Sequence, residues 1–228
     1  KRAMEVMRLF GLDRRDLHRP APAVSGGLPI RPGQICLITG PSGAGKTTLL
    51  RQFYELADVR RRLWLSDIPL AENVRVIDCV EGSVSEALRI LCKTGLGDVF
   101  AILNRPGRLS EGQQYRYRLA RALLSRKQCL FADDFGCSLD SITAGTLAYQ
   151  IRRIVYENRL LFFAASCHSQ AAEALRPDLV IKKDLAGNTE IIRQKNKSRR
   201  QPAGAKSMPP VNRAVRRRTY AGEGKLIT

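Results

Sequence analysis

Residues 35–53 read ICLITGPSGAGKTTLLRQF. The stretch begins with the apolar run ICLIT, which is typical of a buried strand, and ends with a segment that can continue as a helix. Between them, Gly40, Gly43 and Gly45 allow backbone conformations that are closed to other residues, so successive N–H groups can point inward at an anion. A strand, a glycine-rich turn and a helix N-terminus in this order predict a phosphate-binding loop.

The residues of the loop also predict how it would hold a nucleoside triphosphate. Lys46 would reach the β- and γ-phosphates, and Thr47 would ligate Mg²⁺. The expected nucleotide-binding residues are Gly40, Pro41, Ser42, Gly43, Ala44, Gly45, Lys46, Thr47 and Thr48.

The composition suggests a polyanionic partner. The chain has 228 residues, and its Lys and Arg outnumber its Asp and Glu by 39 to 21, which gives a net charge of +18. This excess is larger than one nucleotide site needs, so we expect nucleic acid or, second, an anionic membrane surface as a partner. The chain begins with Lys rather than Met, and we expect it to be a fragment or a processed form.

The cysteines and the apolar runs bear on where the protein works. The six cysteines are scattered without a C-x-x-C pair, a pattern typical of reduced thiols rather than of a disulfide framework or a zinc site. The longest fully apolar run, residues 160–165, is too short for a transmembrane helix, and no secretory signal is visible. We therefore expect a cytoplasmic location.

Apolar periodicity predicts strands that alternate with helices. Strands are expected at 63–65, 74–77, 129–132, 160–165, 179–181 and 190–193, the last two as a hairpin, and helices at about 46–57, 85–96, 112–125 and 142–156. This alternation indicates an α/β fold with a mainly parallel sheet. Residues 1–20 fit either a short helix or an edge strand, and residues 20–33 fit an extended connection.

Four further motifs follow the loop. They are LSEGQ at residues 109–113, LFADD at 130–134, SLD at 138–140 and SCH at 166–168. In this order they resemble the signature motif, the Walker B strand, the D-loop and the switch histidine of ATP-binding cassette (ABC) ATPases. Residues 109–140 look most like a soluble group of the family that is sometimes fused to a predicted acetyltransferase domain.

The resemblance implies a P-loop NTPase fold of ABC type and an ATP hydrolase that uses ATP and Mg²⁺. Asp133 ends a strand that we expect to lie beside the phosphate-loop strand, where its carboxylate would hold Mg²⁺. Asp134 would polarise the attacking water, and His168 would orient that water and the γ-phosphate. With Lys46 and Ser110, these two residues form the expected catalytic set.

The resemblance also implies a homodimer. In the family, two copies close head to tail over two ATP molecules. Ser110, at the start of a helix, and the Gly112 N–H would form a small anion site for the nucleotide of the second copy. Asp140 would take part in the same interface.

Three segments are expected on this basis. Residues 1–24 form a basic N-terminal segment, and residues 25–193 form the ABC-type ATPase domain. Residues 194–228 form a disordered basic tail, because residues 195–228 hold ten Lys or Arg against one acid and have few large apolar side chains.

The chain departs from the family pattern in ways that affect the chemistry. Asp134 stands where the family usually has Glu, so the carboxylate reaches less far and we expect slow hydrolysis. Glu111 replaces the first glycine of the signature, and it either brings a negative charge near the second nucleotide or points outward as an exposed acid.

Other departures affect nucleotide recognition and docking. No glutamine stands in the usual Q-loop position, where Asp78 is a candidate oxygen donor. No Phe, Trp or Tyr lies between Phe10 and Phe53, and His18 is the candidate there for stacking on adenine. The interval from Lys46 to Ser110 is only 64 residues, so the helical subdomain is expected to be reduced.

Three functions stay open. The favoured one is a soluble ATPase that acts on nucleic acid, DNA or RNA, through its basic tail. The alternative is the nucleotide-binding subunit of an ABC transporter, with a membrane subunit as partner and a tail that meets anionic lipid. The third is an ATP-gated clamp with negligible hydrolysis.

Overall fold

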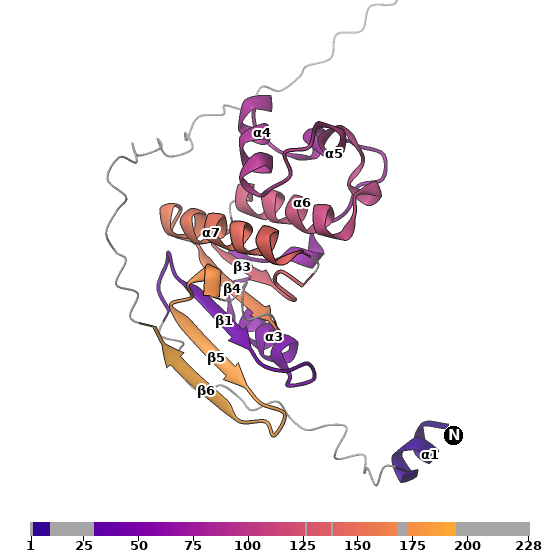
Figure 1. Ribbon diagram of the computed structural model, residues 1–228, viewed down its shortest axis with the longest axis vertical. Helices are drawn as coiled ribbons and strands as arrows, with labels where there is room; N and C mark the ends of the chain where they lie inside the picture. Colours follow the sequence, from indigo (N-terminus) through magenta and orange to yellow (C-terminus); the bar gives the residue numbers. More distant parts are fainter. Residues whose placement is uncertain (1, 10–29, 126, 138, 168–172, 195–228) are drawn as a thin grey trace, which may run out of the picture. The chain divides into compact units, whose positions relative to one another are not determined.

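The computed structural model describes residues 2–9, 30–125, 127–137, 139–167 and 173–194. At its centre is a six-stranded sheet in the order β2-β3-β4-β1-β5-β6 (Figure 1). The strands are β1 (Ile35–Thr39), β2 (Arg62–Trp64), β3 (Cys129–Ala132), β4 (Leu161–Ser166), β5 (Leu179–Lys183) and β6 (Thr189–Arg193). Every neighbouring pair is parallel except β5 and β6, which form an antiparallel hairpin. The predicted α/β fold with a mainly parallel sheet is confirmed.

Helices follow most of the strands. They are α3 (Lys46–Leu56), α4 (Val84–Lys93), α5 (Val99–Leu103), α6 (Glu111–Leu124) and α7 (Ser141–Glu157), with 3₁₀ turns η1 (Leu65–Asp67), η2 (Ile77–Cys79) and η3 (Pro106–Arg108). The N-terminal segment contains the helix α1 (Arg2–Leu9), so helix rather than edge strand is correct there. The predicted tail, apart from Gln194, lies outside the described residues, and so does most of the predicted connection at 20–33.

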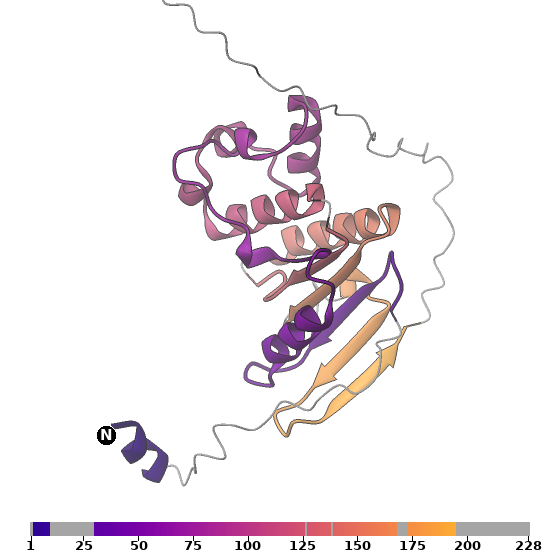
Figure 2. The same cartoon turned by 180° about the vertical axis from the view of Figure 1, so that it is seen from behind.

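The two faces of the sheet carry different helices, as both views show (Figures 1 and 2). Cys36 and Ile38 of β1 pack in one core with the apolar residues of α3. Ile35 and Leu37 pack in the other core with residues of α4, α6 and α7. Because β1 is buried on both faces, it reads as an unbroken apolar run rather than as an alternating one.

Stacked aromatic rings pack across β2, β3 and β4, the three strands that lie on the side of β1 away from β5. Phe131 of β3 lies parallel to Phe163 of β4, with ring centroids 4.7 Å apart, and to Trp64 of β2 at 6.2 Å. Tyr54 of α3 meets both Trp64 and Phe131 edge-on. These contacts fix α3, and hence the start of that helix, against β2, β3 and β4.

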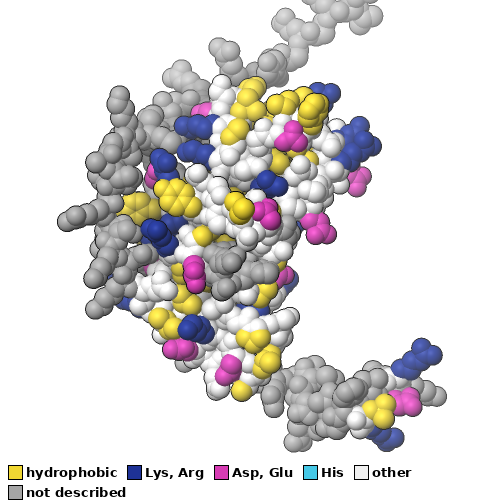
Figure 3. Space-filling model, viewed as in Figure 1, with side chains coloured by type: hydrophobic (Ala, Val, Ile, Leu, Met, Phe, Trp, Pro, Cys, Tyr) yellow, Lys and Arg dark blue, Asp and Glu magenta, His cyan; other side chains and the backbone are white. Residues whose placement is uncertain are grey.

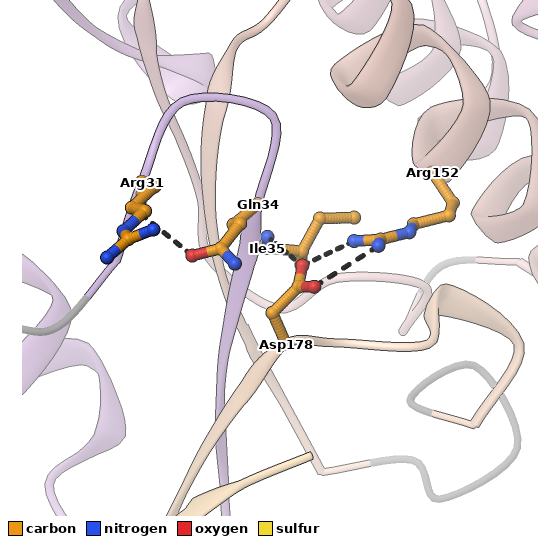
Figure 4. Close-up of polar contacts among 5 residues, drawn as sticks. All are labelled: Arg31, Gln34, Ile35, Arg152 and Asp178. Carbon is orange, nitrogen blue, oxygen red and sulfur yellow. Dashed lines mark hydrogen bonds and ion pairs between the residues drawn. The ribbon is translucent and has the colours of Figure 1, made fainter. Parts of the chain in front are cut away.

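The amino end of β1 is held by one carboxylate. Asp178, just before β5, accepts a hydrogen bond from the Ile35 N–H at 2.9 Å and pairs with both terminal nitrogens of Arg152 from α7 (Figure 4). Nearby, the Arg31 N–H donates to the Gln34 side chain. One acid therefore joins β1, β5 and α7 at the end of the sheet opposite the glycine loop.

The segment between β2 and α6 forms a small helical subdomain. The strand expected at 74–77 is wrong: Val76 is fully buried, its N–H donates to the Asn104 carbonyl at 2.9 Å, and η2 follows directly. The segment is held by the turn after α5 instead of by a neighbouring strand. The stretch Val-Arg-Val-Ile is compatible with either arrangement, and here the hydrogen bond from Val76 to Asn104, just after α5, replaces a strand partner.

Candidate functional site

The glycine loop lies between the carboxyl end of β1 and the start of α3. Gly40, Gly43 and Gly45 have positive φ angles of 147°, 81° and 78°. At Gly40 the space is also closed, because a Cβ there would lie 2.1 Å from the Lys183 carbonyl oxygen of β5. Only glycine fits this position, and the loop keeps the backbone shape in which N–H groups can face an anion.

Lys46 carries the positive charge of the loop. It is the first residue of α3, its side chain is only 8% exposed, and its Nζ donates to the Pro41 carbonyl at 2.8 Å. The ammonium group thus folds back over the loop, held by a neutral acceptor. A phosphate oxygen would be a stronger partner for this ammonium than a carbonyl, because both groups of that pair are charged.

Thr47 and Asp133, the two predicted Mg²⁺ ligands, come together. The Thr47 hydroxyl donates to Asp133 Oδ1 at 3.2 Å. The expectation that the strand before Asp133 lies beside the phosphate-loop strand is wrong, since β4 lies between β3 and β1. Asp133 still reaches Thr47, because the residues that follow β3 pass over the end of β4.

This pair fits a magnesium ion that is bound mainly through phosphate. Among the residues that the structure describes, no group of three or more His, Cys, Asp or Glu side chains could form a metal cage. Mg²⁺ usually takes one or two protein oxygens and completes its shell with water and substrate phosphate. A hydroxyl and a carboxylate 3.2 Å apart at the glycine loop suit this chemistry.

The backbone conformation at position 134 favours Asp over Glu. Its φ is 47°, in the left-handed region, and its N–H donates to Asp133 Oδ1 at 3.1 Å. Among residues other than glycine, Asp and Asn adopt this conformation most readily. An exposed carboxylate that is one methylene shorter than Glu therefore suits the turn, at the cost of reach.

The turn after Asp134 is tied to the end of β4. The Phe135 N–H donates to the Ala165 carbonyl at 2.7 Å, and the Ser166 hydroxyl donates to the Phe135 carbonyl at 2.9 Å. Cys137 and Cys167 follow, with their sulfur atoms 3.6 Å apart. Burial and the neighbouring Cys167 raise the pKa of Cys137 to about 11. His168, the predicted switch histidine, is the next residue and lies outside the described residues, as does His18.

Ser110 begins α6 with a capping box. Its Oγ accepts from the Gln113 N–H at 3.4 Å, and the Gln113 side chain accepts from the Ser110 N–H at 3.1 Å. Glu111 is exposed in the first turn of α6, and it does not point into the protein. A negative charge at this place stabilises the helix through its dipole. The role of Ser110 and Gly112 toward a second copy stays a prediction.

Asp140 and Asp78, two other residues that the sequence predicted for the site, lie in different kinds of local structure. Asp140 caps α7 by accepting from the Thr143 N–H at 2.9 Å, and hydrogen bonds from Thr143 lower the pKa of Asp140. Asp78, the candidate Q-loop substitute, lies exposed in η2 of the helical subdomain instead of after a strand.

Lys183, at the end of β5, was missed by the sequence analysis. It is only 7% exposed, its Nζ lies 3.4 Å from the Thr189 hydroxyl, and its Cε would lie 3.5 Å from a Cβ at Gly45. It makes no ion pair with any residue that the structure describes. It also lines a cavity of about 450 Å³ with Thr39, Gly40, Lys182, Asp184, Asn188 and Glu190. No sequence signal separates this buried lysine from an exposed one.

Tyr115 is a second residue that the sequence did not single out. It lies on α6, its ring packs edge-on against Phe135, and its hydroxyl is buried without a partner among the described residues. Burial, together with Cys137, Asp133 and Asp134, raises the pKa of Tyr115. The signature helix thus packs directly under the turn that carries both acids.

Comparison with known proteins agrees with this geometry. A family model described as an AAA domain matches residues 30–155. The lipoprotein-releasing system ATP-binding protein LolD of Novosphingobium aromaticivorans is 30% identical over 190 residues, which cover 68% of this chain and 84% of that protein. The aliphatic sulfonates import ATP-binding protein SsuB of Delftia acidovorans is 35% identical over 147 residues, 57% of this chain and 60% of that protein.

A solved structure shares the fold. It is the dimeric structure of MJ0796, a bacterial ABC transporter cassette, with a TM-score of 0.59 and 21% identity over 73% of this chain and 89% of that one. The same cassette in a post-hydrolysis state bound to ADP and Pi matches equally well, with a TM-score of 0.59. The chain therefore belongs to the ATP-binding cassette (ABC) ATPase superfamily, and it is an ATP hydrolase that uses ATP with Mg²⁺.

Proposed function

We propose that the chain is the ATP-hydrolysing cassette of an ABC transporter, which works as an ATP-dependent homodimer with a membrane-spanning partner at the cytoplasmic face. The main observation behind this proposal is the contact between Thr47 and Asp133 beside the glycine loop, in which Lys46 donates to the Pro41 carbonyl. The relatives named for lipoprotein release and sulfonate import support a role in transport. They favour the transporter reading over the nucleic-acid reading.

The residues of the site divide the work on one ATP. The loop N–H groups and Lys46 hold the phosphates, with Lys46 exchanging the Pro41 carbonyl for phosphate oxygens. Thr47 and Asp133 would hold Mg²⁺, which would supply positive charge to offset the charge of the phosphates. Asp134 accepts a proton from the attacking water, and His168 orients that water. The short reach of Asp134 makes this step slow.

A second copy completes each site in this proposal. The dimeric state of the MJ0796 cassette supports it. Ser110 uses its oxygen as a helix cap but keeps its hydroxyl proton, so it can still donate to a phosphate oxygen of the other copy. Asp140, at the start of α7, approaches the same interface.

The helical subdomain offers a surface for the membrane partner. Figure 3 shows hydrophobic side chains gathered over α4 and α5, at the top of the view. The exposed apolar residues there are Val84, Leu88, Val99, Phe100 and Leu103, and Phe100 is 85% exposed. Side chains of this kind mark protein contacts when they lie together on a surface.

Nucleic-acid association is the second candidate, and one observation favours it. The chain carries a net charge of +18, half of it in residues 195–228, outside the described residues. The comparisons lend this candidate no support. The resemblance to soluble members that are fused to a predicted acetyltransferase domain likewise stays a prediction.

One assay separates the two candidates. ATP hydrolysis by the purified chain is measured alone, with membranes of the source organism, with duplex DNA and with RNA, each at low and high salt. We expect membranes to raise the rate and nucleic acid to leave it unchanged. Vesicles of the extracted lipids are the control, because the basic tail alone can bind anionic lipid.

A pair of variants connects that result to the proposed surface. Phe100→Ser is expected to abolish the stimulation by membranes and to leave the basal rate intact. Val59→Ser, at a valine before β2 that is 67% exposed, is the control and should be stimulated like the parent chain. Stimulation by DNA or RNA without any response to membranes would overturn the transporter proposal.

A further inference from the structure

Two cysteine side chains lie close together beside the turn that carries Asp134. Cys137, in the turn that follows Asp134, is half-buried, and Cys167, directly after β4, is exposed. Their sulfur atoms are 3.6 Å apart, although 30 residues separate them in the chain. The scattered spacing of the cysteines in the sequence predicted reduced thiols and gave no sign of this pair.

The backbone on both sides holds the two thiols in place. Phe135, two residues before Cys137, bonds to Ala165 and Ser166, which directly precede Cys167. A third bond, from the Cys137 N–H to the Asp134 carbonyl at 3.0 Å, closes the turn. These bonds hold together the two backbone segments that carry the thiols.

We propose that Cys137 and Cys167 form a reversible disulfide that arrests ATP hydrolysis. A disulfide requires the sulfurs to approach from 3.6 Å to about 2.05 Å. Both residues lie outside the helices and strands, Cys137 in a turn and Cys167 in a bend, where the side chains and the local backbone can adjust to make this approach. The cross-link would join the turn that carries Asp134 to the residue that precedes His168.

The chemistry balances with a hydroperoxide as oxidant. The exposed Cys167 thiolate attacks hydrogen peroxide, which gives a sulfenic acid and hydroxide. The Cys137 sulfur then attacks the sulfenic sulfur, the S–S bond forms and water leaves. In total, two thiols lose two electrons and two protons, and one peroxide becomes two molecules of water. A dithiol such as dithiothreitol reverses the change by thiol–disulfide exchange.

The effect on turnover rests on the proposed roles of Asp134 and His168, whereas the cross-link itself does not. Both side chains must reach their working positions when ATP binds and the dimer closes. A bond between their neighbours fixes the two loops in one arrangement. Since displacements near 1 Å cost about a hundredfold in rate, we expect the oxidised protein to hydrolyse ATP at least about tenfold more slowly.

The test begins with the unmodified chain. It is treated with hydrogen peroxide at low protein concentration, remaining thiols are alkylated, and disulfide-linked peptides are mapped by mass spectrometry. The expected product is a monomer that contains a Cys137–Cys167 peptide pair. ATPase activity should fall as this pair appears and return to its starting value with dithiothreitol.

Variants separate this disulfide from general oxidation. Cys167→Ser should keep its full rate after peroxide, and Cys137→Ser should stop at a sulfenic acid on Cys167 that dimedone traps. Cys92→Ser, which removes an exposed thiol of α4, is the matched control and should be as sensitive as the parent chain.

Each contrary outcome is decisive. Absence of the Cys137–Cys167 peptide pair, or a Cys167→Ser variant that loses activity like the parent, overturns the proposal. The peptide pair with an unchanged ATPase rate contradicts the arrest alone. A reduced parent chain without any ATPase activity counts against the function of the site and leaves the mapping of the cross-link informative.

Discussion

The polar side chains at the two ends of the sheet have different kinds of hydrogen-bond and ion-pair partners. At the amino end, the Asp178 carboxylate is shared between the Ile35 N–H and the Arg152 guanidinium, and all three groups are at least partly buried. At the carboxyl end, Lys46 rests on a carbonyl, Thr47 on Asp133, and Asp134 lies exposed on a backbone with positive φ. At the amino end the carboxylate is satisfied within the protein by a guanidinium and a backbone N–H, whereas the partners at the carboxyl end are ones that a nucleotide could replace.

From this difference we infer that the amino end of the sheet contributes mainly to the stability of the fold and the carboxyl end mainly to activity. A buried ion pair that also bonds a backbone N–H is costly to break, because the remaining charge is left without a partner. A lysine held by a carbonyl loses little when phosphate takes over, since the new contact is charge-assisted. The amino end should therefore respond to mutation in stability, and the carboxyl end in activity.

The same substitution at both ends tests this contrast. Asp134→Asn keeps the shape of the side chain and tolerates the positive φ, but it removes the carboxylate that takes a proton from water in the proposed mechanism. We expect the rate of ATP hydrolysis to fall about a hundredfold, and the free energy of unfolding to change by less than about 0.5 kcal/mol. Steady-state phosphate release and urea unfolding measure the two quantities.

That result has a clear opposite. An Asp134→Asn protein that hydrolyses ATP at the parent rate would remove Asp134 from the mechanism. ATP-dependent dimerisation, followed by light scattering, serves as the control, because binding and closure should survive the loss of the base.

Asp178→Asn is expected to show the reverse pattern. The substitution leaves the Arg152 guanidinium, which is partly buried, without its carboxylate, and we expect a loss of about 2–3 kcal/mol in the free energy of unfolding. The rate per folded molecule should stay unchanged. Arg153→Gln on the same helix is the matched control, because its pair with Glu157 is exposed, and little change is expected there. Equal effects of the two substitutions would contradict the contrast.

Lys183→Gln is the smallest and most discriminating test. Lys183 is buried like a structural residue but lies beside Gly45 of the loop. If its charge acts on the bound phosphates, ATP affinity should fall about three- to tenfold, which corresponds to about 1 kcal/mol of Coulomb energy. Lys182→Gln changes the net charge equally but removes an exposed lysine, so its effect on ATP binding should be smaller. Affinity is measured by calorimetry with and without Mg²⁺.

The sequence predicted most of the fold because local patterns decide it. The strand ICLIT, the helices after it and the hairpin of β5 and β6 follow from periodicity and glycine positions. The strand expected at 74–77 was wrong because the Val76 N–H bonds to Asn104, at the end of the short helix α5, which periodicity did not predict. The order of the strands was also partly wrong, because β4 enters between β1 and β3, a choice that depends on crossovers along the whole chain.

The site was predictable where a motif fixes the residue types, and unpredictable where packing creates the contact. The chain positions of Lys46, Thr47 and Asp133 alone indicated that they would meet. The burial of Lys183 and of the Tyr115 hydroxyl, and the proximity of the two thiols, depend on how β5, α6 and the end of β4 pack. None of these three features has a local sequence signature.

Gly40 has a consequence at the level of the gene. Every missense change of one nucleotide in a glycine codon introduces a Cβ, and at this position a Cβ would meet the Lys183 carbonyl at 2.1 Å. Codon 40 is thus expected to accept only synonymous changes in a scan of all single substitutions. Codon 145, in α7, has nothing within 4 Å of its added Cβ and should accept alanine freely. Two glycines of one chain would then lie at opposite ends of its mutational tolerance.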